Sequence, residues 1–120
     1  MREHSKALTR LLREHVRLAH EEELRRALLP LANDFDRWRG GELGSGELSE
    51  RIHDFHQGPA REIWKTYNYG SPDLTLAYAI NTGVLQRESL PPELLAALTP
   101  AVGFHASLDG DAMDGTPAKG

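Results

Sequence analysis

The chain has 120 residues and a net charge of −4, with 39% apolar and 27% charged residues, which suits one soluble globular domain with a modest core. This acidic balance, with a pI near 5.8, argues against general nucleic-acid binding. The absence of cysteine excludes disulfides, thiolate metal sites and cysteine nucleophiles. Without a signal peptide or an apolar run long enough to cross a membrane, we expect a cytoplasmic protein of bacterial type.

Helical periodicity predicts one long helix over residues 3–39, rich in leucine, arginine, glutamate and alanine. Its apolar stripe changes phase near His20. The stripe of the second half lies roughly 160° from that of the first half on a helical wheel. No helix-breaking residue occurs at the change, so we favour a continuous helix. A break near His20 or at Pro30 is the alternative.

In a continuous helix, the stripe of the first half lies away from the domain core and needs a partner. The simplest partner is a second copy of the chain, and a heterologous protein is the alternative. The expected contact residues are Leu8, Leu12, His15, Val16 and Ala19. Arginines and a lysine occupy the other side of this half, where glutamates nearby indicate a solvated surface rather than a nucleic-acid site.

Four shorter helices are predicted over residues 46–57, 59–69, 72–83 and 91–99. Ser45 is the expected N-cap of the first, and Ser71 that of the third, with Pro72 in its first turn. Helix 72–83 is apolar on nearly every side and is predicted to lie at the centre. The expected inward-facing residues of the other three are Leu48, Ile52, Phe55, Ile63, Trp64, Tyr67, Leu94, Leu95 and Leu98.

These elements predict an all-α fold with a single helical domain of five to six helices over residues 1–104. No alternating strand pattern occurs in the sequence. Residues 105–120, rich in glycine, aspartate and alanine, have little to bury and are predicted to form a disordered tail.

Histidines suggest a metal site as one alternative function. Glu50, His53 and His56 fall at helical spacing, and a glutamate three residues before a histidine is half of the ligand set of carboxylate di-metal bundles. The other half is absent from the sequence. The favoured explanation is that these histidines flank the buried stripe and hydrogen-bond to neighbouring groups, so we predict no metal or other cofactor.

Arg51 and His56, separated by four residues, suggest an enzyme as another alternative. This spacing resembles that of HEPN ribonucleases, which are also small all-α domains. The resemblance implies that His56 handles the proton of an RNA 2′-hydroxyl and that Arg51 steadies the phosphate. Ile52 stands where that family commonly has a polar residue.

No complete catalytic set is present, so we expect a non-enzymatic protein. The leading hypothesis is a small helical protein that regulates or binds another protein, and we expect it to form a homodimer through its N-terminal helix.

Overall fold

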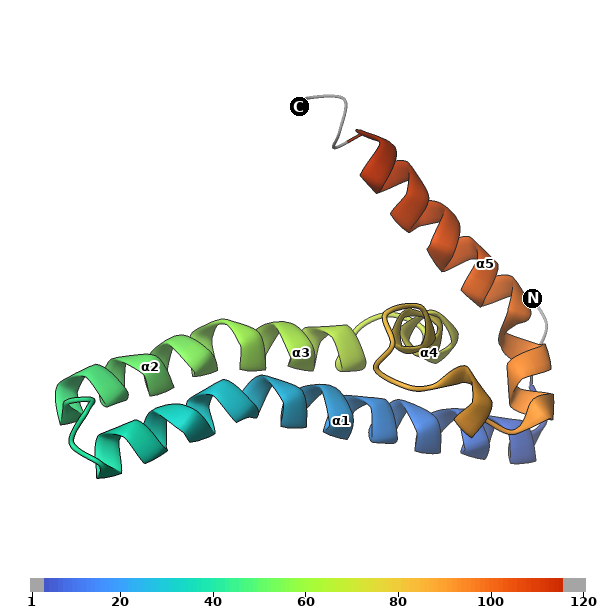
Figure 1. Cartoon of the computed structure of the whole chain (residues 1–120). Coiled ribbons are helices and arrows are strands. Elements are labelled where there is room, and N and C mark those ends of the chain that lie inside the picture. The colour runs from blue at the N-terminus through green and yellow to red at the C-terminus, as the bar shows by residue number, and fades with distance from the viewer. Residues whose placement is uncertain (1–3, 116–120) are drawn as a thin grey trace. The chain divides into compact units, whose positions relative to one another are not determined.

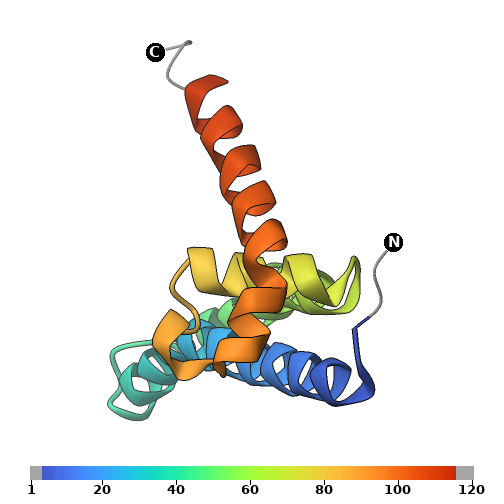
Figure 2. The same ribbon diagram turned by 90° about the vertical axis from the view of Figure 1, so that its right-hand side faces the viewer.

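The computed structural model describes the backbone of residues 4–115 and the side chains of residues 4–106. Within these residues every regular element is a helix, which confirms the all-α class (Figures 1 and 2). The elements are α1 (Lys6–Arg39), α2 (Ser45–Gln57), α3 (Pro59–Asn68), α4 (Pro72–Asn81), the short 3-10 helix η1 (Arg87–Ser89) and α5 (Pro92–Gly115).

The long N-terminal helix forms as one unbroken element, so the favoured alternative is confirmed. α1 passes through His20 and through Pro30 without interruption. Its start is capped by Ser5, whose Oγ accepts a hydrogen bond from the Leu8 backbone N–H at 3.1 Å. Pro30 removes one backbone donor from the helix, but the good helix formers on both sides of it keep the chain helical.

The chain forms two compact units, which are described separately. The crossed unit consists of residues 1–19 and 70–120, and the hairpin unit consists of residues 20–69. The division falls inside α1, between Ala19 and His20, where the apolar stripe changes phase. Each half of α1 thus belongs to a different unit. The single domain expected over residues 1–104 stays a prediction.

In the hairpin unit, α2 and α3 run back along the second half of α1 (Figure 1). At the turn, the Trp38 indole N–H donates a hydrogen bond to Ser45 Oγ at 2.9 Å. At the far end, the Tyr67 hydroxyl donates one to Glu23 at 2.7 Å, and His20 stacks on the Tyr67 ring with centroids 5.2 Å apart. Polar contacts therefore hold the two layers together at both ends.

The hairpin unit buries little apolar surface, because only two helical layers build it. Its buried apolar side chains among the described residues are Leu43, Leu48, Ile63 and Tyr67. Ile52 was expected in the core but is exposed. Ser45 was expected to cap α2, but it is the first helical residue and Gly44 is the N-cap. The Ser45 hydroxyl instead accepts the hydrogen bond from Trp38.

The crossed unit is built around α4. Ser71 caps this helix as expected, because its Oγ accepts a hydrogen bond from the Leu74 backbone N–H at 3.2 Å. Half of the helix is buried, which confirms the predicted central position within this unit; the buried residues are Thr75, Leu76, Ala77, Ala79 and Ile80. Gly83, with a φ of +80°, then turns the chain away from the helix.

α5 crosses α4, which is seen end-on in Figure 1 while α5 is seen along its length. Leu94 and Leu98 of α5 are buried. The helix does not end near residue 99 as expected but continues to Gly115. Contacts just beyond Pro100 favour its continuation past residue 99, because the Asn81 side-chain amide donates hydrogen bonds to Val102 O at 3.2 Å and to His105 Nδ1 at 3.0 Å. Residues 116–120 of the expected tail lie outside the described residues.

Candidate functional site

The stripe expected to bind a partner is partly covered by the chain itself. Leu12 is only 4% exposed and Ala19 is completely buried. Leu8, His15 and Val16 are partly buried. The His15 Nδ1–H donates a hydrogen bond to the Leu11 carbonyl within the same helix, at 2.8 Å. The apolar side chain central to the expected interface therefore belongs to the core of the monomer.

The two residues of the HEPN-like pattern lie in different surroundings. Arg51 lines a pocket of about 280 Å³. There it donates hydrogen bonds to Glu47 at 3.3 Å and to Asp34 at 3.4 Å. The hydrogen bond to Glu47 and the charge of Asp34 raise the pKa of Arg51. His56 lines a separate pocket. The structure thus engages Arg51 in ion pairs and does not place it with His56 in one site.

The alternative metal site is not formed. Among the described residues, no group of three or more histidine, cysteine, aspartate or glutamate side chains is arranged to hold a metal ion. Glu50, His53 and His56 are all exposed on α2. Residues spaced by three along one helix turn progressively around its axis, so these three side chains do not converge on a point.

The strongest candidate site is a surface groove of the hairpin unit, where α2 ends and α3 begins. The groove measures about 470 Å³ and is lined by His56, Gln57, Ala60, Arg61 and Trp64. We call it the aromatic groove. The turn between the two helices positions it, because Gly58 lies at their junction and Pro59 starts α3. Ala60 and Arg61 then lie one turn before Trp64 on the same helix face.

Trp64, which lines the aromatic groove, is one member of an exposed aromatic pair whose other member, Tyr69, lies outside the lining. Trp64 is 49% exposed and Tyr69 is 61% exposed. Their rings meet edge to face with centroids 5.3 Å apart, a favourable geometry for aromatic side chains. Gly70, with a φ of +85°, allows the chain to turn directly after Tyr69. The pair is therefore presented to solvent in a defined arrangement.

The charge of the aromatic groove is positive although the whole chain is acidic. Arg61 is exposed, and within the described part of the chain it makes no ion pair. Among the residues that the structure describes, no aspartate or glutamate lines the groove. Lys65, one turn further along α3, differs from Arg61 because its ammonium group lies 3.9 Å from the Glu62 carboxylate and forms an ion pair with it. A ligand that carries a carboxylate beside an apolar group could thus place the carboxylate at Arg61 and the apolar group on Trp64.

The sequence predicts that Trp64 faces inward together with Ile63 and Tyr67, but the structure exposes it. Only Ile63 and Tyr67, four residues apart, share the buried face of α3. Trp64 lies about 100° away from Ile63 on the helix, on the face of Arg61. This pairing of an aromatic with a cationic residue at a spacing of three was the available signal.

Comparisons with known proteins identify no relative: no family model, no curated protein and no solved structure matches the chain. Among the described residues, no helix combines the length and the apolar character needed to cross a membrane.

Proposed function

We propose that this chain works by binding another protein through the aromatic groove, and that the segment it binds is amphipathic and acidic. The observation that carries the proposal is the exposed Trp64, in edge-to-face contact with Tyr69, in a groove also lined by Arg61, which makes no ion pair among the described residues. Tryptophan, tyrosine and arginine are the residues that most often dominate the energy of protein interfaces. Each offers a large contact area together with a hydrogen-bonding group.

The chemistry of the groove favours an acidic partner over a second copy of this chain. In a twofold homodimer the same patch meets itself, so both copies would bring the positive charge of Arg61 into the contact. Like charges in contact oppose association. An amphipathic helix of another protein, with a large apolar side chain packed on Trp64 and a carboxylate beside Arg61, satisfies both features of the groove.

Selection from a library of short random peptides tests the proposal, with the Trp64→Ala variant used for counter-selection. Trp38→Phe leaves Trp64 as the only tryptophan of a chain that has two, so its fluorescence reports what happens at the groove. We expect enriched peptides to carry a carboxylate near a large apolar residue. We also expect the Trp64 emission to shift to shorter wavelength when such a peptide binds.

Two variants and a matched control measure how much Trp64 and Arg61 contribute to the affinity for the peptide. Trp64→Ala and Arg61→Glu should each weaken peptide binding at least about tenfold, as truncations at interface hot spots do. Arg17→Glu, a change of another exposed arginine in the other unit, should leave affinity unchanged. Enrichment without acidic residues, equal binding by the Arg61→Glu variant, or preferential binding of RNA would each overturn the proposal.

A further inference from the structure

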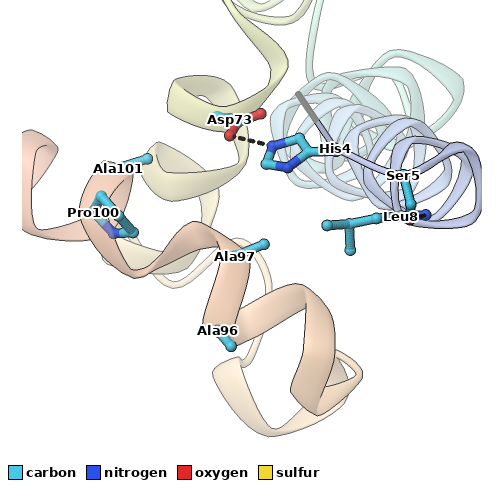
Figure 3. A pocket seen from close by; sticks show the side chains of 8 residues that line it. All are labelled: His4, Ser5, Leu8, Asp73, Ala96, Ala97, Pro100 and Ala101. Carbon is cyan, nitrogen blue, oxygen red and sulfur yellow. Dashed lines mark hydrogen bonds and ion pairs between the residues drawn. The ribbon is translucent and has the colours of Figure 1, made fainter. Parts of the chain in front are cut away.

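The crossed unit contains a cavity that the proposed protein-binding function does not use. Its volume is about 650 Å³. The start of α1, the first turn of α4 and one side of α5 form its walls (Figure 3). The lining residues are His4, Ser5, Leu8, Asp73, Ala96, Ala97, Pro100 and Ala101. A cavity of this size falls in the range of small-molecule sites, about 300–1,000 Å³.

Most of the cavity wall is apolar and made of small side chains. α5 contributes three alanines and Pro100, and Leu8 of α1 faces them across the space (Figure 3). Alanine at these positions leaves room that a leucine or phenylalanine would fill. The body of a ligand in this cavity would therefore be apolar, because an unpaired polar group against these walls would lose its hydrogen bonds to water.

One polar pair interrupts the apolar wall. His4 Nε2 lies 2.8 Å from Asp73 Oδ2, and both side chains are partly accessible. Because an ionised carboxylate only accepts hydrogen bonds, the His4 Nε2–H is the donor. In a neutral imidazole of this tautomer, Nδ1 is an acceptor. Asp73 Oδ1 is a second acceptor of the pair. The polar end of the cavity thus offers acceptors.

The charge at this end is negative. Asp73 is the only carboxylate of the lining, and no lysine or arginine is among the described lining residues. The Ser5 hydroxyl oxygen already accepts a hydrogen bond from the Leu8 backbone N–H. A hydrogen bond from a cation to a carboxylate is stronger than one between neutral groups. A ligand with an ammonium group would therefore gain more here than one with a hydroxyl or a carboxylate.

We propose that this cavity binds a small apolar amine, with its hydrocarbon part against the alanines of α5 and its ammonium group at Asp73 and His4. The site lies within the crossed unit and is independent of the aromatic groove. Failure of either proposal therefore leaves the other intact.

Three probes of equal size and different head groups test the site on the full chain: 3-phenylpropylamine, 3-phenylpropanol and 3-phenylpropionate. Titrations followed by amide NMR give both affinity and position. We expect the amine to bind at least about tenfold more tightly than the carboxylate, as a charge-assisted hydrogen bond allows. The shifted amides should be those of Leu8, Ala97 and Ala101.

Substitutions distinguish loss of amine binding from a general disturbance of the fold. Asp73→Asn should weaken amine binding about tenfold while leaving alcohol binding unchanged. Ala101→Leu should weaken all probes, because it fills the cavity. Glu93→Gln, which removes a carboxylate from the first turn of α5 outside the cavity, should change nothing. Equal affinity of amine and carboxylate, shifts elsewhere in the chain, or amine binding unaffected by Asp73→Asn would overturn the proposal.

Discussion

Glu22 shows how individual side chains stabilise the long helix at the point where its stripe changes phase. Its carboxylate accepts hydrogen bonds from Arg25 at 2.8 Å and from Arg26 at 2.7 Å. These hydrogen bonds, that of Arg25 first, lower the pKa of Glu22 from 4.5 to about 2. Three charges within one turn thus favour the helical conformation around His20, since all of them lie at spacings of three or four.

This lowered pKa predicts a specific dependence on pH. Because the pKa is lower in the folded chain, the stabilisation is fully present above pH 4.5 and is lost as the pH falls toward about 2. Carbon NMR of the Glu22 carboxyl should therefore show a midpoint near 2. Replacing Arg25 and Arg26 together by alanine should return the midpoint to about 4.5, whereas Arg13→Ala should not move it. A parent midpoint near 4.5 would contradict the expectation.

Tyr67, unlike Glu22, is buried, and its hydrogen bond joins two different helices of the hairpin unit. Its hydroxyl donates to Glu23 at 2.7 Å. Tyr67→Phe leaves the ring in place but removes this hydrogen bond to a charged group, so unfolding free energy should fall by about 1.5–3 kcal/mol. Tyr69→Phe, at an exposed position, should cost less than about 0.5 kcal/mol. Urea denaturation compares the two variants, and equal costs would refute the role of the hydrogen bond.

Among the helices, α1 is the one whose first half differs most between the sequence prediction and the structure. Its first half was expected to carry a free interface, and α2 and α3 were expected to bury most of their large apolar residues. In the structure Leu12 is buried while Trp64 and Ile52 are exposed. Most of the exposed large apolar side chains among the described residues thus belong to the hairpin unit, while the central residue of the suspected interface lies inside the crossed unit.

Substitution of Leu12 distinguishes a core residue from an interface residue. Leu12→Ala should lower unfolding free energy by about 2–5 kcal/mol, as removal of a buried leucine side chain does. Leu18→Ala is the matched control, because Leu18 is 41% exposed on the same helix, and it should cost about 0.5 kcal/mol or less. Sedimentation velocity completes the comparison. A Leu12→Ala variant with parental stability that dissociates from a dimer would restore the N-terminal stripe as an interface.

At the scale of the whole molecule, the chain divides its core between two units that share one helix. Leu94 is 1% exposed in the crossed unit and Ile63 is 7% exposed in the hairpin unit. Each residue stabilises the unit that buries it, so local unfolding of the two units should respond to different substitutions.

Hydrogen exchange of backbone amides measures this division. Leu94→Ala should reduce protection in α4 and α5 more than in α2 and α3, and Ile63→Ala should do the reverse. The two variants are each other's controls, because each removes an aliphatic side chain from one core. Equal loss of protection in both units from both variants would instead establish the single cooperative domain that the sequence predicts.

The sequence alone determined the helical class, the continuity of α1 and most helix boundaries, because capping residues, glycine, proline and helical periodicity act within a few residues. It also located the change of phase near His20, which coincides with the division between the units. The continuation of α5 past Pro100 instead involves contacts with Asn81 of α4, more than twenty residues earlier in the chain.

Only the tertiary structure decided which apolar residues are buried and which remain available for binding. Periodicity shows that Leu12 and Trp64 each lie on an apolar face, but not whether another part of the chain covers that face. Leu12 is covered and Trp64 is not. The pairing of His4 with Asp73 was likewise beyond the sequence, because 69 positions separate the two residues and only the fold brings them together.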